Sequence, residues 1–200
     1  MPVSNYTDIQ YIDSRKTAAY LTLGKQMLEI LSERLDPSQT LVILCIGTDR
    51  ATGDCLGPLV GEHLTSRLSF SKNHIPCKIY GTLENPVHAV NLEETIGQIY
   101  SSYTNPYIIA IDAALGIQNH IGYATIAPSS ILPGKGVQKK LPAIGDLSIT
   151  GIVNLSGFTG SALLQSTRLC TVMKLSKMIA GGICYALRCY QQTNYLDSPL

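Results

Sequence analysis

A continuous apolar run, Leu-Val-Ile-Leu-Cys-Ile at residues 41–46, stops abruptly at the polar turn of residues 47–54. Six apolar residues in a row, without polar alternation, are typical of a strand that is buried on both faces. A sheet is buried on both faces only when helices cover it, and parallel sheets are the usual case. This one segment therefore predicts an α/β protein.

The rest of the chain continues an alternation of strands and helices. Apolar spacing predicts helices at residues 18–35, 56–68, 86–103 and 170–190, and strands at residues 41–46, 77–82, 107–111, 122–127 and 147–154. Such alternation indicates a parallel sheet with helices on both faces. We expect a three-layer α/β/α sandwich with a mostly parallel central sheet, as one domain over residues 1–200 in which residues 1–15 are loosely held.

Composition excludes several classes of protein. Hydrophobic residues make up 45% of the chain and charged residues 14%, unlike a disordered protein. Fifteen basic and fourteen acidic side chains leave a net charge of +1, which gives no electrostatic footprint for nucleic acid or a membrane surface. The N-terminus has no signal-peptide pattern, and the longest near-apolar stretch, residues 178–187, is too short to span a membrane. Six cysteines without a CxxC pair fit a reduced, cytoplasmic protein.

Two aspartates, Asp54 and Asp112, follow the first and third predicted strands. Doubly wound sheets commonly have the strand order 2-1-3, so these strands would be neighbours with a crevice at their carboxyl ends. When two carboxyl groups lie close together, one pKa rises and a proton can be shared. Such a pair can activate water and protonate a leaving amine. The alternative interpretation is that each aspartate only caps a helix or a turn.

Further side chains are expected to bind substrate or shape this crevice: Asp49, Arg50, Gly57, Glu84, His88 and Lys135. Arg50 either neutralises Asp49 or holds a substrate carboxylate. His88 could join Asp54 and Asp112 on a metal ion, or simply begin a helix. The glycine spacing matches no nucleotide-binding motif and no GxSxG elbow is present, so we predict neither a cofactor nor a metal.

Three segments resemble motifs of the germination (spore) protease family. Thr-Gly-Asp-Cys-Leu-Gly-Pro at residues 52–58 resembles Thr-Pro-Asp-Ala-Leu-Gly-Pro, and Ala-Ile-Asp-Ala-Ala-Leu at residues 110–115 resembles Ala-Ile-Asp-Ala-Leu. Pro-Gly-Lys-Gly-Val at residues 133–137, followed by basic residues, resembles a third motif in the same order. In its length and in the residues of these motifs, the chain is also similar to the YyaC-type sporulation protein family, whose members look like a shortened germination protease.

The resemblance implies an α/β/α fold like that of hydrogenase maturation proteases. It implies that Asp54 and Asp112 are the essential pair of an atypical aspartic endopeptidase, acting on small acid-soluble spore proteins in the forespore or spore core. Gly53 and Cys55 depart from the protease motif, and Ala143 stands where hydrogenase maturation proteases have a metal-binding histidine. Two functions stay open: a peptidase, and a non-catalytic sporulation factor that binds a peptide or protein in the same cleft. The oligomeric state is not predicted.

Overall fold

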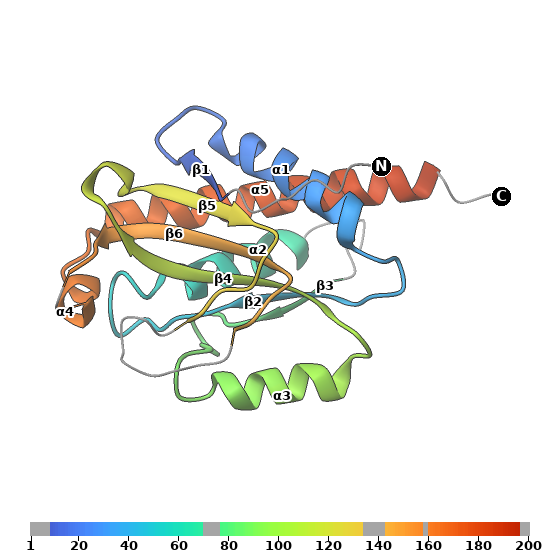
Figure 1. Ribbon diagram of the computed structural model, residues 1–200, viewed down its shortest axis with the longest axis horizontal. Coiled ribbons are helices and arrows are strands. Elements are labelled where there is room, and N and C mark those ends of the chain that lie inside the picture. Colours follow the sequence, from blue (N-terminus) through green and yellow to red (C-terminus); the bar gives the residue numbers. More distant parts are fainter. Residues whose placement is uncertain (1–8, 70–76, 134–142, 158–159, 197–200) are drawn as a thin grey trace.

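A six-stranded sheet forms the middle layer of the protein, in the order β1-β5-β6-β4-β2-β3 (Figure 1). The computed structural model describes residues 9–69, 77–133, 143–157 and 160–196. Its strands are β1 Gln10–Asp13, β2 Leu41–Cys45, β3 Cys77–Tyr80, β4 Tyr107–Gly116, β5 Tyr123–Ala127 and β6 Leu147–Leu155. Strands β3, β2, β4 and β6 pair in parallel, whereas β5 and β1 add antiparallel pairs at one edge. The predicted neighbours, β2 and β4, are confirmed.

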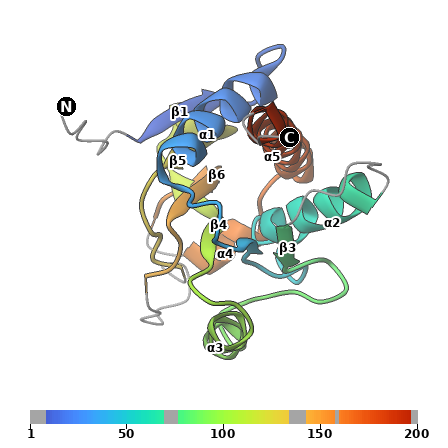
Figure 2. The same cartoon turned by 90° about the vertical axis from the view of Figure 1, so that its right-hand side faces the viewer.

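Helices cover both faces of the sheet, which confirms the three-layer α/β/α architecture (Figure 2). Helices α1 Ala19–Arg34, α2 Leu56–Ser69 and α5 Leu169–Leu196 lie on one face, and α3 Leu92–Ser102 lies on the other. Alternate strand residues point to the two layers: Ile43 and Ile109 join the core under α1, α2 and α5, and Val42 and Ile108 join the core under α3. The short helices η1 Gln118–His120 and α4 Gly160–Gln165 complete the described elements.

Strand β4 is longer than the sequence predicts. The expected strand ends at Ile111, but β4 continues through Asp112 to Gly116. Its pairing with β2 does end at Ile111, opposite Cys45, while its pairing with β6 continues to Gly116. The polar and small residues of the second half are held in the strand by β6, which apolar patterning within β4 alone does not reveal.

Helix α3 begins at Leu92, later than the predicted residue 86. The Val87 carbonyl accepts a hydrogen bond from the Gly47 N–H at 2.7 Å, which ties the segment to the end of β2. The Asn91 side chain accepts from the His88 N–H at 2.8 Å and donates to the Pro86 carbonyl at 3.1 Å. These bonds hold residues 86–91 in a turn and leave the helix to start after them.

Strand β1 lies within residues 1–15, the N-terminal stretch that is predicted from the sequence to be loosely held. Residues 10–13 pair with β5, and Ile12 is buried in the core. The strand is four residues long and mostly exposed, so its apolar pattern is too short to be recognised in the sequence. This correction concerns residues 10–13; residues 1–8 lie outside the described part of the chain.

Helix α5 packs along α1 and α2. A Cβ built on Gly24 of α1 would lie 2.7 Å from the Gly182 carbonyl oxygen, so the two helices approach at backbone distance. Within the described residues, α5 is also the one helix long and apolar enough to cross a membrane, over Leu169–Thr193. Since 56% of its most apolar window is buried in the fold, that composition is explained by a core helix.

Candidate active site

The loop that carries Asp54 joins β2 to α2 at the carboxyl end of the parallel strands. Gly47 has a φ of +144°, and a Cβ there would overlap the Asp54 carbonyl oxygen, so this turn requires glycine. The same carbonyl accepts a hydrogen bond from the Thr48 N–H at 3.1 Å. Gly57, expected to bind substrate, is buried, and a Cβ there would overlap the Ile46 carbonyl. The structure thus gives Gly57 a packing role, since it lets α2 approach β2.

Helix α4 holds the same loop from the other side. The Gly53 N–H donates to the Leu164 carbonyl at 2.8 Å, and a Cβ on Gly53 would lie 2.9 Å from the Thr167 Oγ1. Thr167 Oγ1 in turn donates to the Leu163 carbonyl at 2.8 Å. No sequence motif places this segment at the site, because the contact joins residues far apart in the chain.

Asp112 lies in β4, one residue beyond the last pair with β2. Ile111 belongs to the core under α1, α2 and α5, so alternation turns the Asp112 side chain toward the face that α3 covers. Its Oδ1 accepts a hydrogen bond from the Ala113 N–H at 2.8 Å, and Thr150 of β6 lies opposite in the register. The residue is partly exposed, yet protein packs densely around its carboxyl group.

The two aspartates interact electrostatically. Burial and the negative charge of Asp54 raise the pKa of Asp112 to about 8, against the opposing effect of the hydrogen bond from Ala113. Burial also raises the pKa of Asp54. A pKa of about 8 keeps Asp112 mainly protonated at neutral pH. A protonated carboxyl group beside a second carboxyl group, at the switch point of the sheet, is an arrangement that can support acid–base hydrolysis.

Cys55, one of the residues at which the chain departs from the protease motif, directly follows Asp54 in the loop. Burial, then the charges of Asp49 and Asp54, raise the pKa of its thiol. A reactive cysteine needs the opposite environment, since the thiolate is the nucleophile. These effects disfavour the thiolate form of Cys55.

The other predicted residues are distributed around the same end of the sheet. Asp49 and Arg50 are exposed on the loop, and Glu84 is exposed after β3. His88 is half-buried, and its Nδ1 accepts the Val90 N–H at 3.3 Å, which gives it a role in the turn. Lys135 lies outside the described residues.

Metal binding finds no support in the described part of the chain. No group of three or more His, Cys, Asp or Glu side chains lies close enough there to hold an ion, so Asp54, Asp112 and His88 do not form such a group. Ala143, at the position compared with a metal-binding histidine, is exposed. The interpretation of a shared metal is not supported by the arrangement of these residues.

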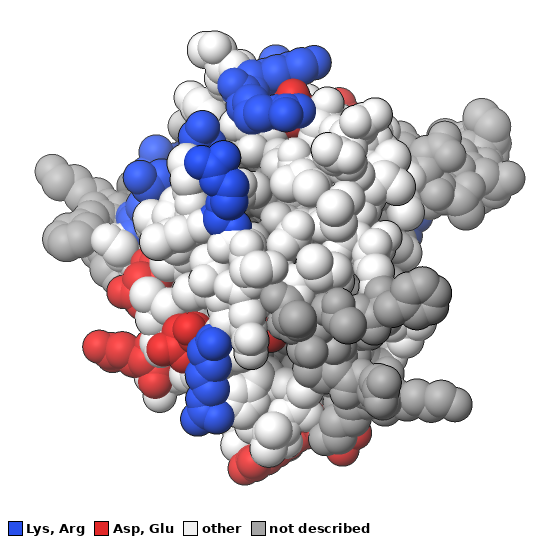
Figure 3. All heavy atoms as spheres, turned by 90° about the vertical axis from the view of Figure 1, so that its left-hand side faces the viewer, with Lys and Arg blue, Asp and Glu red and all other residues white. Residues whose placement is uncertain are grey.

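The face at which the parallel strands end is shown in Figure 3. Acidic side chains gather along its lower left, and basic side chains lie mainly above them. Among the residues that the structure describes, the charges on this face are therefore mixed, with no single sign that would select for a strongly charged substrate at a distance.

Comparison with known proteins identifies one family. Residues 11–182 match the family model described as "Protein of unknown function (DUF1256)". The "Uncharacterized protein YyaC" of Bacillus subtilis (strain 168) is 44% identical over 176 residues, covering 87% of this chain and 82% of that protein. Among solved structures, the [NiFe] hydrogenase maturation protease HycI from Thermococcus kodakarensis KOD1 is 18% identical, with a TM-score of 0.48 over 80% of this chain and 99% of that chain.

Proposed function

We propose that this chain, which belongs to the DUF1256 family, is a peptidase in which Asp54 and Asp112 form the acid–base pair. The observation that carries the proposal is the raised pKa of Asp112, which burial and, after it, the charge of Asp54 bring to about 8. In such a pair, the carboxyl group that keeps its proton is the candidate acid and its partner is the candidate base.

The proposed reaction follows from these protonation states. The Asp54 carboxylate accepts a proton from a water molecule while the water oxygen attacks the carbonyl carbon of the peptide bond. Asp112 donates its proton to the carbonyl oxygen, which gives a neutral tetrahedral intermediate. When the C–N bond breaks, Asp54 passes its proton to the leaving nitrogen and Asp112 recovers a proton from the diol. The pair ends the cycle as it began.

The edge of β4 supports an extended peptide as the substrate. From Asp112 to Gly116, β4 pairs with β6 but has no register partner in β2. An extended peptide can add to such an edge through main-chain hydrogen bonds. This would bring its backbone beside Asp112. The resemblance to germination protease motifs supports a sporulation-related protein, with small acid-soluble spore proteins as the first substrates to test.

The test is cleavage of purified small acid-soluble spore proteins by the full chain. We expect Asp54→Asn and Asp112→Asn each to lower the cleavage rate by roughly 10²-fold or more, the usual scale of general acid–base catalysis. The rate should also fall above pH 8 as Asp112 loses its proton. Glu29→Gln, an exposed carboxyl change on α1, is the matched control and should cleave normally. Equal cleavage by all the variants would remove the aspartates from the mechanism.

The alternative is a sporulation factor that binds a peptide at this edge without cleaving it. It is favoured by the main-chain edge of β4, whose hydrogen bonds do not depend on the aspartate charges. Stable capture of the same spore proteins, without turnover and with full strength in Asp54→Asn, would identify this function instead.

A further inference from the structure

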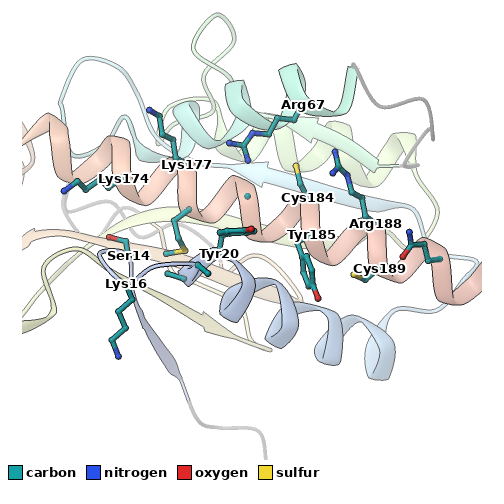
Figure 4. A pocket seen from close by; sticks show the side chains of 15 residues that line it. Ser14, Lys16, Tyr20, Arg67, Lys174, Lys177, Cys184, Tyr185, Arg188 and Cys189 are labelled. Atoms are coloured by element: carbon teal, nitrogen blue, oxygen red, sulfur yellow. The ribbon is translucent and has the colours of Figure 1, made fainter.

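A basic groove of about 920 Å³ lies on the outer side of the helical layer, away from the aspartates. Its walls come from the start of α1, the end of α2 and the middle of α5 (Figure 4). Neither aspartate is among its lining residues, so it is separate from the candidate active site.

Positive charge is concentrated in this groove. Of the chain's 15 lysines and arginines, five line it, namely Lys16, Arg67, Lys174, Lys177 and Arg188. None of the described residues that line it is acidic. The ion pair found among the described residues, between Arg15 and Asp13, involves none of the five. Because the chain as a whole carries only +1, this excess is local.

Two arginines lie close to Cys184 in the groove. A Cβ built on Gly181 of α5 would lie 3.4 Å from Arg67 Nη1 and 3.3 Å from the Tyr20 Cβ, so side chains of α2 and α1 meet above this glycine. In Figure 4 the guanidinium groups of Arg67 and Arg188 lie on either side of Cys184. Although burial raises the pKa of the Cys184 thiol, the charges of Arg67 and Arg188 both act to lower it.

The lysines extend the same positive field. In Figure 4, Lys174 and Lys177 project from α5 and Lys16 projects from the segment before α1. Burial lowers the pKa of the neighbouring His63, the charges of Arg67 and Lys177 lower it further, and the charge of Glu62 opposes these effects. An anion in the groove would meet both guanidinium and ammonium groups.

We propose that this groove binds a small molecule that carries two or more phosphoryl groups. A guanidinium group matches the geometry of a phosphate with paired hydrogen bonds, whereas lysine acts as a point charge. The volume lies in the range of small-molecule sites, and an acidic protein partner would need a contact of about 800 Å² on each side. Tyr20 and Tyr185 provide ring surfaces for an organic part of the ligand.

Calorimetric titration of the full chain with pyrophosphate and with ATP tests the proposal. We expect binding that weakens with added salt, and a loss of about tenfold or more in affinity for Arg67→Gln and for Arg188→Gln, because each removes charge-assisted hydrogen bonds. Lys25→Gln removes an exposed charge of α1 outside the groove and should bind as the unchanged protein does. Thermal unfolding of each variant verifies that it is folded.

The variant Gly181→Leu distinguishes binding at a defined site from general attraction of anions by the positive charges. It leaves every charge in place but fills the floor between Arg67 and Tyr20, so it should also weaken binding at least tenfold. The proposal is overturned if neither pyrophosphate nor ATP binds with a dissociation constant below about 1 mM. It is also overturned if Lys25→Gln weakens binding as much as the arginine variants do. Tighter binding of a hexaglutamate peptide than of both phosphates would overturn it as well. These readouts do not depend on peptidase activity.

Discussion

Asp112 places a carboxyl group where its charge is poorly solvated. Its pKa of about 8 compares with 3.8 for an ordinary aspartate. Between these pH values the folded chain binds a proton that the unfolded chain has released, so the free energy of unfolding falls as the pH rises from about 4 to about 8. The protonation that would make Asp112 useful as an acid therefore also sets the pH dependence of stability.

Replacing this carboxyl group should stabilise the protein at alkaline pH. We expect Asp112→Asn to raise the free energy of unfolding by roughly 1–3 kcal/mol at pH 9 and to change it little at pH 4, where the native carboxyl is neutral. In thermal unfolding this corresponds to a Tm increase of about 2–10 °C. Glu29→Gln should show no such difference between the two pH values. A less stable Asp112→Asn at pH 9 would contradict the burial of the charge.

Helices α1 and α5 depend on the small residues between them. Gly24 and Gly182 face each other, and a Cβ on Gly24 would lie 2.6 Å from the Tyr185 Cδ1. Side chains cannot be inserted at such a contact without moving one helix. Since Tyr20 and Gly181 lie on the same pair of helices, this packing also fixes one wall of the basic groove.

Gly24→Val should therefore destabilise the fold by about 1–3 kcal/mol, the usual cost of overpacking. Lys25→Val is the matched control, because it places the same β-branched residue at the adjacent, exposed position of α1. Its effect should stay within about 0.5 kcal/mol. Denaturant unfolding of both variants measures the difference, and equal losses would mean that the close approach of the helices is unimportant for stability.

Elements with long apolar patterns could be predicted from the sequence. The strands at residues 41–46 and 107–111 follow from their buried runs, and the predicted adjacency of these two strands is confirmed. Boundaries set by tertiary hydrogen bonds could not be predicted. The second half of β4 depends on β6, the start of α3 depends on the turn at residues 86–91, and β1 depends on β5.

The candidate active site and the basic groove also differ in how far they could be predicted from the sequence. Asp54 lies on the loop after β2 and Asp112 lies one residue beyond the last β2–β4 pair, and a topological rule brings these two positions to one edge of the sheet. The support from Leu164, and the basic groove around Gly181, join segments that share no sequence pattern. Each lysine or arginine of the groove looks in sequence like an ordinary surface residue, and only the folded structure shows that they line one groove.

The whole molecule has two cores of unequal size on the two faces of its sheet. The core under α1, α2 and α5 contains most of the buried apolar residues, while the core under α3 is a smaller cluster that includes Leu92 and Ile99. Local opening is easiest where the least apolar surface must be exposed. The two layers should therefore differ in their resistance to opening, even though they share one sheet.

Hydrogen exchange followed by mass spectrometry should resolve this difference. We expect amides of α3 to exchange through a partial opening, at least tenfold faster than those of residues 108–111 in β4, which are buried on both faces. Amides in the buried parts of α5 should exchange as slowly as those of β4. Exchange of α3 at the rate of β4 would instead indicate a single cooperative unit.

The overhang of β4 beyond β2 bears on how a reaction cycle would end. A peptide added along this edge holds on through a row of main-chain hydrogen bonds, each of modest strength. Cleavage beside Asp112 divides these hydrogen bonds between two fragments, so each fragment binds with fewer hydrogen bonds than the intact peptide. On the proposed function, cleavage itself would weaken the binding of both products, and they would be released without a conformational change of the enzyme.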